Sequence, residues 1–201
     1  MKKLLALALT LGLFSFTLND PLSEKDRKFA LTYFNEVKDR LNNDIKGLSD
    51  EQLNWKAADS VWSIANCIEH IAIAEKNLTE YAMASLKETA DPAKKTELKH
   101  TDEAIMKMIT DRSFKAKAPE GFRPTGQFGS AKDALKTFNE RRDANLSFLK
   151  STQEDLRNHF IPHPFLGTID SYQMMLFINA HTLRHTLQVE EVKANPAFPK
   201  K

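Results

Sequence analysis

The sequence predicts an all-α protein built as a four-helix bundle. Apolar residues recur at close to 3.6-residue spacing in four long segments, and residues that begin or end helices flank those segments. Strand-like alternation never extends beyond a few residues. Helices with one apolar stripe must bury it against each other, so four of this length are expected to form a bundle.

The four long helices are predicted over residues 22–46, 63–89, 130–150 and 170–193. The first ends near Gly47, and a single helical turn over Asp50–Leu53 follows it. Asp91-Pro92 stops the second helix. Ser130 is the expected cap of the third helix, and Asp170 or Ser171 that of the fourth.

A long connection separates the second helix from the third. A short helical piece is expected over Asp102–Ile109, but Pro119–Gly126 contains two prolines and two glycines and cannot be regular helix. The segment that follows the third helix, Pro162–Gly167, is predicted to be a turn-rich break. With 201 residues, 41% of them hydrophobic, the chain has enough mass for one domain with a large core.

Residues 1–20 read as an export signal, and residues 21–201 as the folded domain. Met1-Lys2-Lys3 is followed by an apolar run from Leu4 to Leu18, shorter than the roughly 20 residues of a membrane-spanning helix. The protein is therefore expected to be periplasmic or secreted, without stable membrane insertion after cleavage. No small-x-small cleavage site is evident, so an N-terminal membrane anchor is the alternative.

The charge balance argues against a nucleic-acid partner, and the cysteine content excludes an internal disulfide. Without Lys2 and Lys3, the 29 basic residues fall to 27, equal to the 27 acidic ones. A nearly neutral domain is a poor nucleic-acid binder, so no such partner is expected. Cys67 is the only cysteine and cannot form an internal disulfide, so the core alone must stabilise the fold.

Three histidines are the candidate metal ligands. His181 and His185 are four residues apart on the last helix, which places them about 40° apart in rotation and about 6 Å apart along the axis. His70 lies among isoleucines on the second helix, where an unpaired imidazole would be costly to bury. Three imidazoles suit a divalent transition metal, with zinc and nickel the leading choices. The alternative is that His70 is a core residue with one hydrogen-bond partner.

Two segments resemble the DinB-like superfamily of metal-binding four-helix bundles. Trp62-Ser63 followed by His70 is similar to that family's W-S-x-x-x-x-x-x-H pattern. His181-Thr182-Leu183-Arg184-His185-Thr186-Leu187-Gln188 is similar to its H-x-x-R-H-x-x-Q pattern in the last helix. The resemblance implies up-down-down-up connectivity with a long crossover between helices two and three, a three-histidine metal site, and frequent homodimers.

For several residues near the three histidines in the sequence, more than one role is possible. Gln188 could order a histidine or lie on the surface, and Asn66 has the same two readings. Arg184 is expected to pair with a carboxylate of the first helix or, less favourably, to bind an anionic substrate. Cys67 is expected to be a buried thiol rather than a ligand. His100, His159 and His163 lie in connections and are expected to be solvated.

The sequence leaves two functional classes open. One is a metal-dependent hydrolase or thiol transferase acting on an unknown small molecule, with unknown catalytic residues. Thr182 follows His181, so the H-E-x-x-H general base of zinc proteases is absent. The resembled family includes transferases that use low-molecular-weight thiols, and such thiols are kept in the cytosol, which fits an exported protein poorly. The other class is a non-enzymatic exported protein that binds a metal or small ligand.

Overall fold

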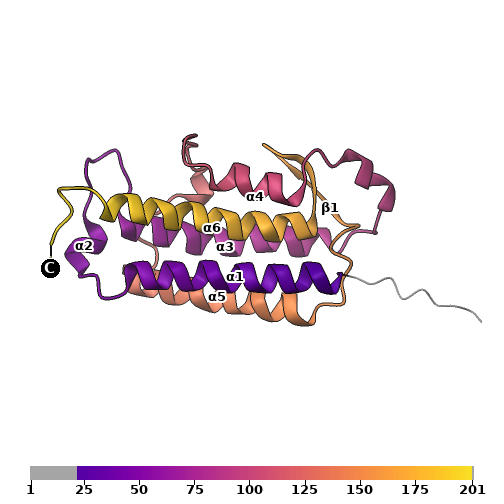
Figure 1. Ribbon diagram of the computed structural model, residues 1–201, viewed down its shortest axis with the longest axis horizontal. Coiled ribbons are helices and arrows are strands. Elements are labelled where there is room, and N and C mark those ends of the chain that lie inside the picture. The colour runs from indigo at the N-terminus through magenta and orange to yellow at the C-terminus, as the bar shows by residue number, and fades with distance from the viewer. Residues whose placement is uncertain (1–21, 201) are drawn as a thin grey trace, which may run out of the picture.

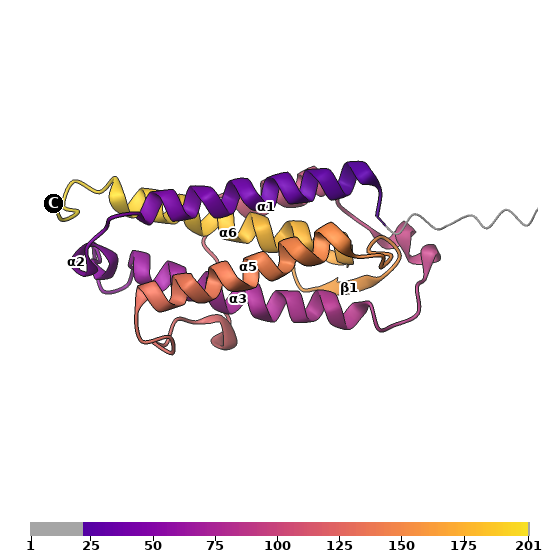
Figure 2. The same ribbon diagram turned by 90° about the horizontal axis from the view of Figure 1, so that it is seen from below.

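The computed structural model describes residues 22–200, which form a bundle of four long helices. These helices are α1 (Glu24–Ile45), α3 (Ile64–Ser85), α5 (Ala131–Ser151) and α6 (Ser171–Lys193). Both α1 and α3 pack against α5 and α6, so the four helices form a ring. In Figures 1 and 2, α1 and α6 run in one direction while α3 and α5 run in the other. The predicted four-helix bundle with up-down-down-up order is therefore confirmed.

The crossover, residues 86–130, makes this order possible. Because α3 and α5 are parallel neighbours, the chain must return from one end of the bundle to the other between them. The crossover does so along the outside of the bundle and contains three short elements: η1 (Pro92–Glu97), α4 (Asp102–Thr110) and η2 (Glu120–Phe122). Helix α4 packs on α6, as Figure 1 shows.

Local sequence signals define where the helices begin. The side chains of Ser130 and Asp170 accept the N–H groups of Asp133 and Gln173, so both predicted caps are confirmed. The short α2 (Asp50–Asn54) lies where a single turn was expected, and α4 also matches its predicted position. Helix α3 ends at Ser85, before the predicted end at Thr89. Such differences of a few residues are common at helix ends.

The predicted turn-rich break is in fact part of a β-hairpin. Strands β1 (Phe160–His163) and β2 (Gly167–Asp170) pair antiparallel, with Phe160 opposite Asp170 and His163 opposite Gly167. Each strand has only four residues, too few to show an alternating pattern. Pro162 further masks the strand, although β1 is an edge strand, where proline is tolerated.

The core lies between the four helices and beneath the crossover. Residues 171–180, which make up the first half of α6, are all buried. This half is covered on its outer side by α4 and on its inner side by α1 and α3. The burial of the first half of α6 therefore depends on the crossover. This buried half anchors the second half of the same helix, which carries His181 and His185.

The predicted export signal and membrane anchor fall on residues 1–20, which lie outside the described part of the chain. Within residues 22–200, no helix is long and apolar enough to cross a membrane.

Candidate metal centre

His70, His181 and His185 converge between α3 and α6. Each offers one ring nitrogen within 4.8 Å of those of the other two, and Nε2 of His70 lies 3.1 Å from Nε2 of His181. His70 comes from the second turn of α3, whereas His181 and His185 lie one turn apart on α6. The structure thus brings together all three histidines that the sequence singled out.

In His70 and His185, the ring nitrogen that faces away from the cluster has a hydrogen-bond acceptor. Nδ1 of His70 lies 2.6 Å from the carbonyl oxygen of Phe122, which can only accept, so Nδ1 carries the proton. Nδ1 of His185 lies 3.0 Å from Oε1 of Gln188, and Arg112 donates to that same oxygen at 3.1 Å. Both imidazoles therefore present an unprotonated Nε2. Ligating histidines commonly have an outward N–H bonded in this way.

The separation of the imidazoles fits a small cation. Two nitrogens that are each 2.0–2.1 Å from a tetrahedral zinc ion lie about 3.3 Å apart. The 3.1 Å between the Nε2 atoms of His70 and His181 is close to that value. In its donor chemistry, and in the spacing of this one nitrogen pair, the cluster matches an imidazole site for a divalent transition metal.

Burial favours the neutral form of the three imidazoles. His70 and His185 are buried and His181 is half-buried. Desolvation lowers the pKa of His70 below its ordinary value. It lowers the pKa values of His181 and His185 further, and the neighbouring imidazoles add to this effect. Neutral rings have the lone pairs that a metal requires.

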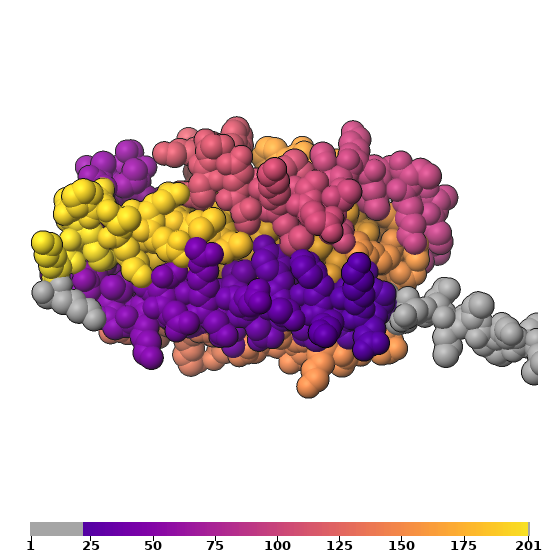
Figure 3. All heavy atoms as spheres, viewed as in Figure 1, coloured from indigo at the N-terminus to yellow at the C-terminus, as the bar shows by residue number. Residues whose placement is uncertain are grey.

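Aromatic rings enclose the cluster on two sides. Trp62 stacks on His185 at a centroid distance of 5.7 Å and lies 4.8 Å from His70. Phe177 lies parallel to His181 at 6.1 Å. The indole of Trp62, which is part of the family-like motif, therefore lies against two of the three imidazoles. Figure 3 shows the atoms of the α2–α3 connection and of the crossover as two separate groups above α6.

Arg184 does not pair with a carboxylate of α1 or face a free anion position. Its guanidinium donates to the backbone carbonyls of Ile109, Asp111 and Phe114. These carbonyls follow or end α4, where helical C=O groups lack partners. Arg184 therefore attaches the crossover to α6, which corrects the sequence prediction.

The other polar side chains near the histidines are engaged elsewhere. Asn66 completes a capping box with Ser63 at the start of α3. Glu190 accepts two hydrogen bonds from Arg40, at 2.7 and 2.9 Å. Cys67 is buried, as expected, and desolvation raises the pKa of its thiol to about 12. It is not part of the histidine cluster.

One of the three histidines expected in solvent is buried. Nδ1 and Nε2 of His159 lie 2.7 and 3.1 Å from the carbonyl oxygens of Asp155 and Glu88. These contacts attach the segment before β1 to the end of α3. Sequence position alone could not show this, because Glu88 is distant in the chain.

His163 in the hairpin is expected to resist protonation. Its Nδ1 accepts the N–H groups of Phe165 and Leu166 at 3.2 and 3.3 Å, and partial burial lowers its pKa. The unfolded chain then takes up a proton near pH 6.5 while the folded protein does not, so this contribution to stability is lost as the pH falls from 6.5 through the folded-state pKa. NMR titration of the His163 ring should give a midpoint below 6.5. A midpoint at or above 6.5 would contradict this assignment.

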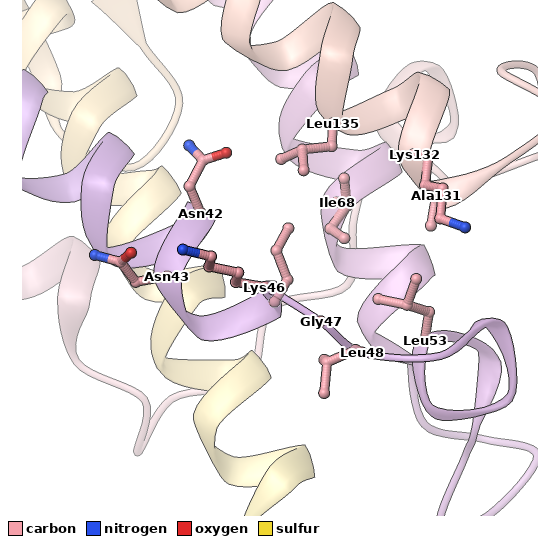
Figure 4. A pocket seen from close by; sticks show the side chains of 11 residues that line it. Asn42, Asn43, Lys46, Gly47, Leu48, Leu53, Ile68, Ala131, Lys132 and Leu135 are labelled. Atoms are coloured by element: carbon pink, nitrogen blue, oxygen red, sulfur yellow. The ribbon is translucent and has the colours of Figure 1, made fainter. Parts of the chain in front are cut away.

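A cavity of about 560 Å³ lies away from the histidines. Figure 4 shows its lining, which comes from the end of α1, the α1–α2 connection, α2, and the facing sides of α3 and α5, with Lys46 and Lys132 among the polar groups. Ile68 is the lining residue nearest in sequence to His70, and no metal-ligand candidate contributes to the wall. The cavity is therefore separate from the candidate metal centre.

Three comparisons relate the chain to known proteins. The family model described as the DinB superfamily matches residues 33–189. The Bacillus subtilis protein YuaE, described as uncharacterized, is 30% identical over 163 residues, which is 81% of this chain and 96% of YuaE. The solved structure of YfiT from Bacillus subtilis has a TM-score of 0.57 at 16% identity, covering 86% of this chain and 88% of YfiT. That structure is described as a probable metal-dependent hydrolase with an unusual four-helix bundle topology. Because the family match spans most of the chain, and the relative and the fold agree with it, this protein belongs to the DinB superfamily.

Proposed function

We propose that the protein binds one divalent transition metal through the Nε2 atoms of His70, His181 and His185, and that the bound metal serves hydrolysis or group transfer. The observation that carries the proposal is the convergence of three neutral imidazoles within 4.8 Å from two helices. The description of YfiT supports the hydrolase reading by analogy of fold. Zinc and nickel are the metals we consider first, because both accept imidazole ligands.

The protein's own groups would hold and shield such a metal. Phe122 and Gln188 fix the rings of His70 and His185, while Trp62 and Phe177 cover the cluster with apolar surface. When bound by three protein ligands, the metal would supply an open Lewis-acid position that activates water or polarises a small substrate. The half-buried His181 marks the side from which solvent reaches the cluster.

A second candidate function is binding without catalysis. An enzyme would need a polar group beside the metal, and Asn66, Gln188 and Glu190 are the polar side chains near the histidines in sequence. Asn66 caps α3, Gln188 is shared by His185 and Arg112, and Glu190 pairs with Arg40. A protein that only stores or carries a metal or small ligand needs no such group. This observation favours a non-enzymatic metal-binding or ligand-binding protein as the alternative, and its export is proposed from residues 1–20 alone.

Metal analysis of the purified protein tests the proposed site. Wild type is expected to contain about one transition metal per chain by mass spectrometry, whereas His70→Ala and His185→Ala should contain almost none and keep their helical circular dichroism. His100→Ala is the matched control, since His100 lies outside the cluster. Equal metal content in wild type and a His70→Ala/His185→Ala double variant would remove the proposed site.

A turnover assay would distinguish a metal-dependent enzyme from a protein that only binds a metal or small ligand. Metal-loaded and metal-stripped protein would be screened against thiol conjugates and small amides. Metal-dependent product formation supports the hydrolase or transferase, and binding without turnover supports the alternative.

Export, a small-molecule ligand and a homodimer are further proposals that rest on the sequence. Intact mass of the protein recovered from its native host would show whether residues 1–20 are removed. Sedimentation velocity would show whether it is a dimer.

A further inference from the structure

We propose that Glu69 is a positioning residue for the metal centre, acting through the crossover rather than by touching the metal. This inference rests on the proposed metal-binding function. Glu69 immediately precedes His70 on α3 and is buried, with 7% of its surface exposed. A buried carboxylate needs compensating hydrogen bonds, and the crossover supplies them.

The carboxylate of Glu69 fills a nest of backbone N–H groups. Its Oε1 accepts from Thr125, Gly126 and Gln127 at 2.9, 2.8 and 3.0 Å. Three successive N–H groups aimed at one point form an anion-binding concavity. Gly126 has a φ of +81°, which favours glycine over other residues. The backbone of residues 125–127 therefore has the conformation that is needed to bind the Glu69 carboxylate.

Three residues before the nest lies the carbonyl that orients His70. Phe122 O accepts from His70 Nδ1 at 2.6 Å, and the preceding carbonyl, that of Gly121, accepts from Asn77 at 3.2 Å. Glu69, His70 and Asn77 all lie on α3, so the segment from Gly121 to Gln127 is attached to one helix at three points. Release of the nest would free the Phe122 carbonyl to move away from the ring.

The crossover also reaches the second helix that carries ligands. Arg112 donates to Gln188 Oε1, the oxygen that accepts from His185, and its remaining nitrogens pair with Glu191 at 2.7 and 3.1 Å. One continuous segment thus holds the outward nitrogens of His70 and His185. This arrangement gives the crossover a role beyond connecting two parallel helices.

Glu69 does not act as a metal ligand in this arrangement. The ligand atoms that cluster come from the three histidines alone. Oε1 of Glu69 is already occupied by three donors. Its effect on the metal must therefore pass through the backbone of the crossover.

The test compares Glu69→Gln and Glu69→Ala with Glu80→Gln. Glu80 lies on the same helix but is exposed and forms an ion pair with Lys76 at 3.7 Å, so it is a matched charge control. Zinc affinity by chelator competition is expected to fall about 10- to 100-fold in Glu69→Ala, less in Glu69→Gln, and not in Glu80→Gln. The visible spectrum of the cobalt-substituted protein should change in the Glu69 variants only, which a general loss of stability would not produce.

Nitrogen-15 spectra of the imidazole rings in metal-free protein provide the second readout. Wild type should show His70 with its proton on Nδ1, and Glu69→Ala should shift the population toward Nε2. Unchanged affinity and an unchanged tautomer in Glu69→Ala would overturn this inference while leaving the metal site intact. If wild type bound no zinc or cobalt at all, the proposed function would fail instead, and the tautomer would still decide whether Glu69 positions His70.

Discussion

Replacing Glu75 by alanine is expected to lower the free energy of unfolding by about 3–5 kcal/mol, because it leaves a buried charge unpaired. Glu75 on α3 and Arg142 on α5 have fully buried side chains and meet at 2.8 Å. The change would remove the counter-charge and leave the guanidinium in the core. Urea denaturation of metal-free protein would measure the loss.

The surroundings of this pair explain the size of the effect. The other oxygen of Glu75 accepts from Asn145 at 2.8 Å, and Arg142 donates to Thr182 at 2.7 Å and to Asn179. The guanidinium also lies 4.5 Å from the centroid of the Phe34 ring. These contacts join all four long helices. The unpaired guanidinium of Arg142 therefore cannot reach water unless the helices separate.

Two control variants test whether the loss of stability in Glu75→Ala comes from the buried ion pair. Glu140→Ala removes a partner from the exposed Lys136–Glu140 pair and should change stability little. A Glu75→Leu/Arg142→Met double variant should be less destabilised than Glu75→Ala, because it removes both charges. If Glu75→Ala cost no more than Glu140→Ala, the pair would not be essential to the core.

Metal loading is expected to produce the second large effect. At a free zinc concentration 1,000 times the dissociation constant, the free energy of unfolding should rise by about 4 kcal/mol, since the proposed site would bind zinc in the folded state and not in the unfolded chain. His70 and His181, whose Nε2 atoms lie 3.1 Å apart, are 111 positions apart in the chain, so the site does not exist before α3 and α6 pack. Denaturation midpoints with zinc and with chelator would measure the difference.

The histidine variants are the controls for this second prediction. His185→Ala should unfold at the same midpoint with zinc and with chelator, because it lacks a ligand. A zinc-dependent rise of equal size in wild type and His185→Ala would show that the stabilising ion binds elsewhere.

Local sequence patterns predicted most of the helical architecture. Periodic apolar residues located the four long helices, and Ser130 and Asp170 located two of their starts. Such signals act between residues a few positions apart, so they can be read without knowing the fold. The hairpin at residues 160–170 was missed because its strands are too short to create a period.

The candidate metal residues were predictable, but their supports were only partly so. The spacing of His181 and His185 and the two family-like motifs indicated the ligand set. The motif also offered Gln188 as a residue that could order a histidine, and its bond to His185 agrees with that reading. Phe122 could not be found in this way, because it contributes a backbone carbonyl and any residue has one.

For charged side chains too, the sequence gives the position in a helix but not the partner. Glu69, Glu75 and Arg142 look in the sequence like members of solvated helix faces, yet all three are buried. Arg184 was assigned a carboxylate partner and instead donates to three carbonyls of the crossover. Helix positions follow from interactions between near neighbours in the chain, and the candidate ligands from one short spacing and two short motifs, so the sequence determined both by itself. The partner of each buried polar group depends on which distant segments pack together and exclude water, and only the tertiary structure decided that.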